Sequence, residues 1–221
     1  MKTLVVIPAF NESKNIDNVI NSIKKYNFDY LIINDNSTDN TAQILDDKNY
    51  NHLDLPINVG IGGVTIIGFK YARDYEYDCV VCIDGDGQHD PAYVIPFIKE
   101  IENGNDYVLG SRFVEQKKPF SLRMLGSNVI SLLIKLKTGK TIKDPTSGMR
   151  ALGKSTISLL ADNTNFFAEP DTICYLLKHN LKVKEVQVEM KERQGGTSYF
   201  MNPFKSISYM LHVIISIIIL K

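Results

Sequence analysis

The sequence predicts an α/β fold in which a mostly parallel central sheet carries helices on both faces. The first observation is that short apolar runs alternate with segments whose apolar residues recur at helical spacing. The second is that two polar clusters, NDNSTD and DGDGQHD, directly follow apolar runs, and ligands of such sheets bind beyond the strand ends. The third is that 221 residues with 44% hydrophobic content suit one α/β domain, or at most two small ones, without disulfides.

Each element of the first half has its own signal. Residues 3–8, 30–33, 79–83 and 107–109 are apolar, β-prone runs bounded by turn residues, so we expect strands there. We expect helices at residues 16–23, 42–45 and 63–73, the first of them after an N-cap in the Ser13 region. Asp90 followed by Pro91 predicts a further N-cap with proline at the first helical position.

The second half is less regular. Residues 121–137 and 170–179 have helical character, and residues 183–190 alternate as a strand does. KDPTSGMRAL predicts a turn that enters a strand, and ERQGGTSYF predicts a glycine-containing mobile loop. No repeat, low-complexity tract or linker marks a domain boundary.

Residues 207–220 form an apolar segment interrupted by Ser208, His212 and Ser216. This segment is too short for a bilayer span, which needs about 20 residues. A buried helix, a helix lying at a membrane surface and the first part of a membrane segment all stay open. The N-terminus has no secretion signal, so we expect a protein that is cytosolic or faces the cytosol.

Charge is distributed unevenly along a chain that is neutral overall. Residues 1–110 contain 8 basic and 17 acidic residues, and residues 111–221 contain 17 basic and 8 acidic residues. This asymmetry predicts an acidic half that needs a cation and a basic half that meets phosphate or an anionic surface. The sequence contains no basic run with interleaved aromatic residues, so nothing in it indicates nucleic-acid binding. Cys79 and Cys82 should point to opposite faces of a strand, which argues against a zinc site.

The cluster DGDGQHDP places Asp84, Asp86 and Gln88 two residues apart at the end of a predicted strand. Hard divalent cations such as Mg²⁺ prefer such oxygen ligands and keep open positions for phosphate oxygens. A solvated acidic turn would look the same if the cluster stood alone.

Seven motifs in order give the cluster its context: VVIPAFNE, INDNSTDNT, NVGIGG, DGDGQHDP, GSRF, DPTSGMR and RQGGTS. Together they resemble the family 2 glycosyltransferases with the GT-A fold, specifically the dolichyl- or polyprenyl-phosphate sugar synthases. The resemblance runs from Val5 to about Ser198. It implies a GT-A domain over residues 1–200, with a nucleotide and metal half at 1–110, an acceptor half at 111–200, and an apolar or interfacial helix at 201–221.

The resemblance implies roles for residues of the nucleotide half. Those that match the family's nucleotide contacts are Pro8, Phe10, Glu12, Asp35, Asn58 and Asp84. Asp35 could instead be a turn or N-cap aspartate. Metal, Mg²⁺ or Mn²⁺, would lie on Asp86 and Gln88 with Asp84 close by, and would neutralise the departing nucleotide diphosphate. Arg193 and Ser198 match a loop that closes over the diphosphate.

In the acceptor half, Arg112, Arg123 and Ser127 match the family's pocket for the acceptor's phosphate. Arg123 and Ser127 are four residues apart and should share one helical face. The general base is the open question. A phosphate monoester is already anionic and can attack without a base, whereas a sugar hydroxyl needs a carboxylate. Candidate bases are Asp144, Glu169 and Asp171, of which Glu169 and Asp171 could equally orient Arg112 or Arg123 by charge pairing.

The resemblance therefore implies an inverting, metal-dependent transfer from a UDP- or GDP-sugar to polyprenyl phosphate at the cytoplasmic face of a membrane. Alternatives are transfer to a sugar hydroxyl of a lipid-linked or wall polysaccharide, a sugar nucleotidyltransferase, and a non-catalytic membrane scaffold. Many relatives continue into two or more membrane helices, and this chain has one apolar segment. That difference leaves open both its membrane attachment and a partner subunit that would supply it.

Overall fold

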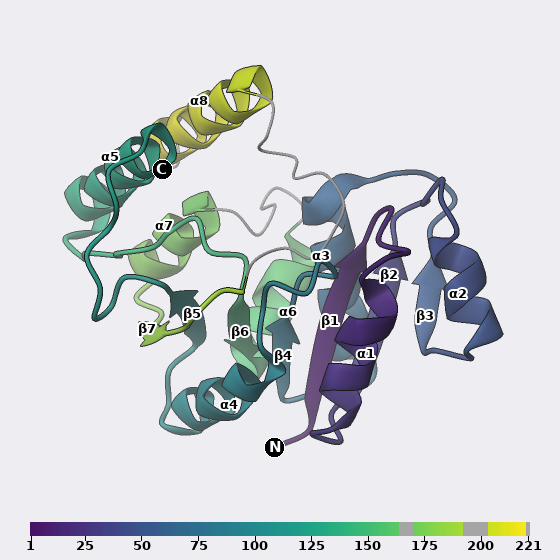
Figure 1. Ribbon diagram of the computed structural model, residues 1–221. Coiled ribbons are helices and arrows are strands. Elements are labelled where there is room, and N and C mark those ends of the chain that lie inside the picture. The colour runs from purple at the N-terminus through teal and green to yellow at the C-terminus, as the bar shows by residue number, and fades with distance from the viewer. Residues whose placement is uncertain (164–169, 192–202, 220–221) are drawn as a thin grey trace.

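A computed structural model describes residues 1–163, 170–191 and 203–219. In this part of the chain, seven strands form one sheet in the order β3-β2-β1-β4-β6-β5-β7 (Figure 1). The strands are β1 (Thr3–Ala9), β2 (Asp29–Asn34), β3 (His52–Asp54), β4 (Cys79–Cys82), β5 (Tyr107–Ser111), β6 (Arg150–Gly153) and β7 (Val183–Gln187). The α/β fold with a mostly parallel sheet is confirmed.

One strand departs from the parallel arrangement. β6 pairs antiparallel with both β4 and β5, in a register that places Arg150 opposite Cys82 and opposite Leu109. The other pairs, β1 with β2, β1 with β4, β2 with β3 and β5 with β7, are parallel. The carboxyl ends of β1, β2 and β4 therefore lie at one edge, and β6 brings the segment before it to that same edge.

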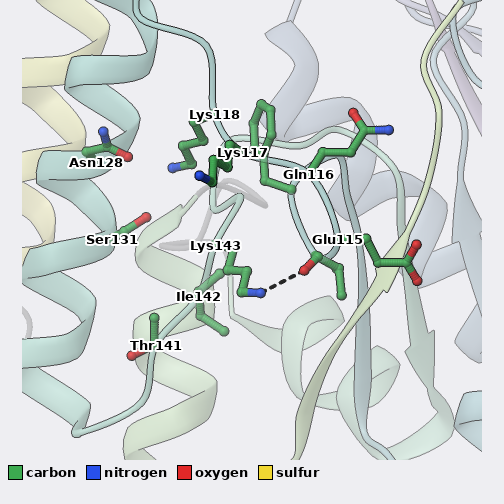
Figure 2. Close-up of a pocket in the computed structure, with 11 residues that line it drawn as sticks. Glu115, Gln116, Lys117, Lys118, Asn128, Ser131, Thr141, Ile142 and Lys143 are labelled. Carbon is green, nitrogen blue, oxygen red and sulfur yellow. Dashed lines mark hydrogen bonds between the residues drawn. The ribbon is translucent and has the colours of Figure 1, made fainter.

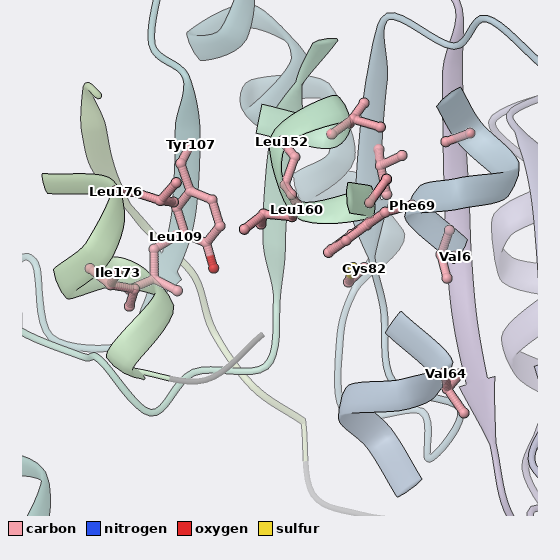
Figure 3. Packing of buried hydrophobic residues seen from close by; sticks show 14 of the residues in the cluster. Val6, Val64, Phe69, Cys82, Tyr107, Leu109, Leu152, Leu160, Ile173 and Leu176 are labelled. Atoms are coloured by element: carbon pink, nitrogen blue, oxygen red, sulfur yellow. The ribbon is translucent and has the colours of Figure 1, made fainter. Parts of the chain in front are cut away.

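Helices cover both faces of the sheet, as the alternation of elements predicts. They are α1 (Ile16–Lys24), α2 (Thr41–Asp47), α3 (Gly60–Asp74), α4 (Val94–Glu102), α5 (Leu122–Thr138), α6 (Lys154–Asp162), α7 (Pro170–Lys178) and α8 (Pro203–Ile219). One core cluster joins α3, α5, α6, α7 and α8 to the sheet, and Figure 3 shows Phe69, Leu160 and Ile173 within it. The second cluster, on the other face, contains residues of α1, α2 and α4.

Two elements, β3 and α6, were not predicted from the sequence. β3 is short and largely exposed, so it carries no apolar alternation. α4, which follows the predicted N-cap at Asp90, contains Pro96; this proline is tolerated because it lies in the first turn, where its missing N–H has no partner to bond. α6 begins with Ser and Thr residues that resemble a turn, although Ile157 and Leu160 are buried.

Two predicted boundaries also differ. α1 has its N-cap at Asn15 rather than in the Ser13 region, and the Asn15 side chain donates a hydrogen bond to Glu12 instead of capping the helix. β7 ends at Gln187, earlier than the predicted residue 190, and only an isolated bridge joins Met190 to His89. The predicted N-cap is correct, because the Asp90 side chain accepts from the Ala92 N–H, although a short 3₁₀ turn at Pro91–Tyr93 precedes α4.

The apolar C-terminal segment is helical in α8, which packs against α5 and α7 (Figure 1). Val213 and Ile217 are buried, while Leu211, Ile215 and Ile218 are more than half exposed. The described part of α8 is thus buried on one side only. Among the helices that the structure describes, none is both long enough and apolar enough to cross a bilayer.

Candidate active site

The loops after β1, β2 and β4 meet at the carboxyl edge of the sheet. The Asp35 N–H, just past β2, donates to the Ala9 carbonyl at the end of β1 (2.9 Å). Gly85, after β4, lies so close to the first loop that an added Cβ would be 2.8 Å from the Pro8 carbonyl oxygen. The IPAFNE, NDNSTD and DGDGQHD motifs, far apart in sequence, therefore form one surface.

Asp35 is held in place by the start of α3. Its two carboxylate oxygens accept the backbone N–H groups of Val59 (2.7 Å) and Gly60 (2.9 Å), and the Asn58 side chain donates to the Asp35 carbonyl (3.0 Å). Asp35 is buried. It therefore fixes the first turn of α3 against the loop after β2, although the N-cap residue of that helix is Val59, and each oxygen retains a lone pair for a ligand.

The first loop contains one exposed and one buried side chain of interest. Phe10 is 48% exposed, which suits a ring that stacks on a flat ligand such as a nucleotide base. Glu12 is buried; its Oε2 accepts from the Asn15 side chain (2.8 Å), and its backbone N–H donates to Thr41 (2.9 Å). The loop is thereby fastened to α1 and α2.

The buried side chain of His89 supports the DGDGQHD loop. The Asp84 N–H donates to His89 Nδ1 (3.1 Å), so Nε2 carries the proton of the neutral ring. His89 is buried and its Nε2 has no hydrogen-bond partner among the residues that the structure describes. Gly148 of DPTSGMR packs on the same group, since an added Cβ would be 2.7 Å from Asp84 Oδ2. His89 and Gly148 thus restrict where the Asp84 carboxylate can lie.

Asp84, Asp86 and Gln88 together have the chemistry of a site for a hard cation. The Gln88 N–H donates to Asp86 Oδ1 (3.0 Å), which folds the loop into a turn that carries both the buried Asp86 carboxylate and the Gln88 side chain, two residues apart. Two carboxylates and an amide oxygen are ligands that Mg²⁺ and Mn²⁺ accept.

A second acidic group lies elsewhere on the same edge. Asp46, His52 and Asp54 have side-chain atoms within 4.8 Å of one another, but β3 is separated from β4 by two strands, and Asp46 and Asp54 are exposed. His52 Nε2 lies 3.3 Å from Asp54 and 3.4 Å from Asp46.

Lys191 is tied to the DGDGQHD loop. Its ammonium lies 2.8 Å from Asp90 Oδ2, its N–H donates to the Gln88 carbonyl (2.9 Å), and its carbonyl accepts from Gln88 Nε2 (3.3 Å). The hydrogen bond from Lys191 holds the pKa of the Asp90 carboxyl below its usual range. The pairing of residues 88–90 with 190–191 could not be read from the sequence.

Arg112 and Asp144 form a buried, two-pronged ion pair. Arg112 Nε donates to Asp144 Oδ2 (2.7 Å) and Nη2 to Oδ1 (2.8 Å), and the Arg112 N–H donates to Oδ2 as well (3.1 Å). Asp144 is fully buried, and Glu185 of β7 accepts the N–H groups of Lys143 and Asp144. Both oxygens of Asp144 thus accept hydrogen bonds from Arg112 and orient its guanidinium.

Ser127 has an unexpected partner. Lys118 Nζ donates to Ser127 Oγ (3.0 Å), which joins the loop after β5 to the buried side of α5. The Arg123 side chain lies outside what the structure describes. Sequence reasoning missed Lys118 because two adjacent lysines before a proline have the pattern of a solvated turn.

Asp171 is turned toward α8. Its Oδ1 accepts from the Thr172 N–H (2.8 Å), and its Oδ2 accepts from the Ser216 hydroxyl (2.6 Å). It is buried at the packing of α7 against α8. Three other predicted site residues lie outside the described part of the chain: Glu169, Arg193 and Ser198. The predicted glycine-containing loop lies outside it as well.

The cysteines are part of the core. Cys79 belongs to one core cluster and Cys82 to the other, which confirms that they point to opposite faces of β4. Burial raises the pKa of both thiols to about 12. They are therefore neither a metal pair nor reactive thiolates at neutral pH.

Comparison with known proteins agrees with this arrangement. The profile of glycosyl transferase family 2 matches residues 4–158. A UDP-N-acetylglucosamine–dolichyl-phosphate N-acetylglucosaminyltransferase of Methanococcus voltae is 31% identical over 84% of this chain and 84% of its own length. A dolichol-phosphate mannosyltransferase of Pyrococcus furiosus is 32% identical over 71% of this chain but only 47% of its own length.

Solved structures show the same fold. Glucosyl-3-phosphoglycerate synthase from Mycobacterium tuberculosis in complex with phosphoglyceric acid superposes with a TM-score of 0.73, at 18% identity, over 96% of this chain and 79% of the other. The same enzyme with Mn²⁺, UDP and phosphoglyceric acid gives a TM-score of 0.71, at 15% identity, over 98% of this chain and 78% of the other.

Proposed function

Because this chain belongs to glycosyl transferase family 2 and is a glycosyltransferase, we propose that it transfers a sugar from a UDP- or GDP-linked donor to polyprenyl phosphate. The observation that carries the choice of acceptor is an exposed apolar surface directly beside a basic pocket. The activities for which the relatives from Methanococcus and Pyrococcus are named support it, since both names specify dolichyl or dolichol phosphate.

The apolar surface is formed by α5 and α8, which contact one another. Lys137 of α5 also donates to the Ile218 carbonyl of α8 (2.7 Å). Large apolar side chains that are exposed on the two helices recur every three or four residues, so they share one side of each helix. These residues, the α5/α8 apolar surface, are Leu125, Val129, Leu132, Leu136, Leu211, Ile215, Ile218 and Ile219.

The basic pocket borders the same helix. It has a volume of about 450 Å³ and lies between residues 113–118, α5 and residues 141–143. Figure 2 shows Asn128 and Ser131 on the α5 side, and Lys117, Lys118 and Lys143 on the loops. An acceptor with a phosphate head and an apolar tail could place its head in this pocket and its tail along the α5/α8 apolar surface. A water-soluble acceptor would leave that surface unused.

The state of the carboxylates favours a phosphate acceptor over a hydroxyl acceptor. A hydroxyl needs a base to take its proton, whereas a phosphate monoester is an anion that can attack directly. Asp144 is engaged by Arg112, and Asp171 by Thr172 and Ser216. Neither offers an oxygen that is free of a protein donor. Transfer to a sugar hydroxyl would have to use another carboxylate, such as Glu169.

Asp84, Asp86 and Gln88 would hold Mg²⁺ or Mn²⁺. When bound, the metal supplies positive charge to the nucleotide diphosphate, whose charge grows as the sugar leaves. The chain's own groups do the rest: Asp35 and the first loop would position the nucleoside, and Arg112 would orient the acceptor phosphate. Mn²⁺ and UDP in the mycobacterial structures support this part of the proposal.

A lipid acceptor places the enzyme at a membrane surface, for which we propose the cytoplasmic face, where nucleotide sugars are available. The α5/α8 apolar surface, flanked by the exposed lysines Lys135 and Lys137, suits an anionic lipid surface. We also propose that a partner subunit could supply membrane attachment. The proposal keeps the division of the chain into a nucleotide and metal half, an acceptor half and an apolar helix, at residues 1–110, 111–200 and 201–221.

The test is product analysis by mass spectrometry. Purified protein is incubated with Mn²⁺ or Mg²⁺, a mixture of UDP- and GDP-sugars, and one acceptor at a time: polyprenyl phosphate, phosphoglycerate or a lipid-linked sugar. We expect a glycosyl-phosphoryl-polyprenol from a single donor. Asp86→Ala should lower turnover at least about 100-fold, the typical cost of losing a group that stabilises transition-state charge.

The matched control is Asp46→Ala, which removes an exposed aspartate from the other acidic group. It should keep wild-type turnover within about twofold, since surface substitutions rarely have large effects. Sugar transfer to phosphoglycerate or to the lipid-linked sugar, with none to polyprenyl phosphate, would refute the proposed acceptor. Loss of activity in Asp46→Ala but not in Asp86→Ala would place the metal at β3 instead.

A further inference from the structure

Lys118 is a cation held at the wall of the basic pocket by its neighbours. It lines the pocket and is partly buried, and its ammonium donates to the hydroxyl of Ser127, which is 1% exposed. Because Ser127 is anchored on α5, this bond fixes the far end of a long, otherwise flexible side chain. The ammonium is thus preorganised beside the pocket.

The charge of Lys118 is not neutralised by an ion pair within the described part of the chain. Burial lowers the pKa of its amine, an effect that the carboxylates of Asp144 and Glu185 oppose from a distance. Those carboxylates have closer partners, because Asp144 holds Arg112 and Glu185 accepts two backbone N–H groups. A half-buried cation without its own counter-ion is stabilised by an incoming anion.

Phe113 brings Lys118 and Arg112 to one place. The guanidinium carbon of Arg112 lies 5.1 Å from the centre of the Phe113 ring, and Lys118 Nζ lies 5.6 Å from the same centre. The Arg112 charge is offset by Asp144, so that pair is close to neutral. Of these two cations over the ring, Lys118 is the one whose charge is not offset by an ion pair within the described residues.

We propose that Lys118 binds the phosphate of the acceptor, through its ammonium, with Ser127 holding the ammonium in position. The inference deepens the proposed function and rests on it for the identity of the acceptor. The ligand chemistry is a phosphate monoester, and the molecule that carries it could be a polyprenol or a small soluble compound.

The experiment measures binding by isothermal titration calorimetry with geranyl phosphate, geraniol and inorganic phosphate as probes. The variants are Lys118→Met, which keeps length and apolar volume but removes the charge, and Lys118→Arg, which keeps the charge. Lys140→Met is the matched control, because Lys140 is an exposed lysine just beyond α5 that does not line the pocket. Thermal unfolding of each variant checks the fold.

We expect Lys118→Met to weaken geranyl phosphate binding by about 10- to 100-fold, the usual effect of a lost charge-assisted hydrogen bond. Lys118→Arg and Lys140→Met should stay within about threefold of wild type, and geraniol binding should not depend on Lys118. The inorganic phosphate arm identifies the source: a Lys118-dependent affinity there means that the phosphate group alone is recognised, and none means that the prenyl tail is needed. Both results support the proposal.

Unchanged geranyl phosphate affinity in Lys118→Met would overturn it. An equal loss in Lys140→Met would also overturn it, because a general electrostatic field rather than a site would then explain binding. The transfer assay separates this inference from the proposed function. If wild-type protein glycosylates no polyprenyl phosphate but binds geranyl phosphate through Lys118, the proposed function fails and the inference stands. If transfer occurs and Lys118→Met leaves the KM for polyprenyl phosphate unchanged, the proposed function stands and the inference about Lys118 fails.

Discussion

Replacing Asp144 by asparagine tests whether this residue positions Arg112 or acts as a base. Asp144 is fully buried and accepts three hydrogen bonds from Arg112, two of them at 2.7 and 2.8 Å from the guanidinium. Asparagine keeps the shape but removes the charge and turns an N–H donor toward another donor. Removing one partner of a buried pair costs about 3–5 kcal/mol. The Arg112 side chain is 19% exposed, so water screens part of this, and we expect about 3 kcal/mol.

Denaturant unfolding of Asp144→Asn, Arg112→Met and the double variant measures that cost. A loss of about 3 kcal/mol corresponds to a fall in Tm of about 6–12 °C for a chain of this size. The double variant should be more stable than the sum of the two losses predicts, by about 1–3 kcal/mol, because the pair acts as a unit. Asp162→Asn is the control: it breaks an exposed pair with Arg73, which water screens, and should cost far less stability than Asp144→Asn.

Kinetics distinguish the two roles. If Asp144 orients Arg112, Asp144→Asn should raise the KM for the acceptor phosphate and leave the KM for the nucleotide sugar nearly unchanged. A loss of kcat with an unchanged acceptor KM, together with stability within about 1 kcal/mol of wild type, would refute the positioning role and make Asp144 the base.

Two further predictions follow from close contacts around the DGDGQHD loop. Gly148→Ala would place a Cβ 2.7 Å from Asp84 Oδ2. We therefore expect Mn²⁺ binding, measured by electron paramagnetic resonance, to weaken at least about tenfold, and stability to fall by about 1–3 kcal/mol. An unchanged Mn²⁺ affinity would show that Asp84 does not contribute to the metal site. Lys191→Met should raise the pKa of Asp90, measured by carboxyl NMR. Because Asp90 has a lowered pKa in the folded state, the wild-type advantage over Lys191→Met, about 0.2–1 kcal/mol, should be complete at pH 7 and shrink below about pH 4.

The sequence contains enough information to predict the fold because its strands carry strong local signals. The run at β4 is wholly apolar and ends abruptly in DGDGQHD, so both the strand and the position of its carboxyl end could be read directly. The direction of β6 could not be predicted, because its antiparallel pairing of Ala151 with Val81 and Val108 depends on contacts between distant segments. β3 was missed because only three residues, mostly exposed, make up the strand.

The candidate site divides in the same way. The resemblance to the family predicted Asp35, Asp86 and Arg112 as site residues through the motifs that contain them. Their partners were harder to predict: the sequence presented Asp144 as a candidate base, and only the fold brings it onto Arg112. Lys118 had no distinguishing signal, since its role depends on reaching Ser127 across a turn. Sequence patterns indicate the chemistry of a side chain, and long-range packing decides which neighbouring residue it contacts.

In the proposed reaction, the acceptor's phosphate is itself the nucleophile that attacks the anomeric carbon. This can be tested by ³¹P NMR of the product formed from polyprenyl phosphate and a donor labelled with ¹³C at the anomeric carbon. We expect the monoester signal to be replaced by a phosphodiester signal split by coupling to the labelled carbon. Transfer of the labelled sugar to any acceptor oxygen outside a phosphate, with the monoester signal unchanged, would contradict it.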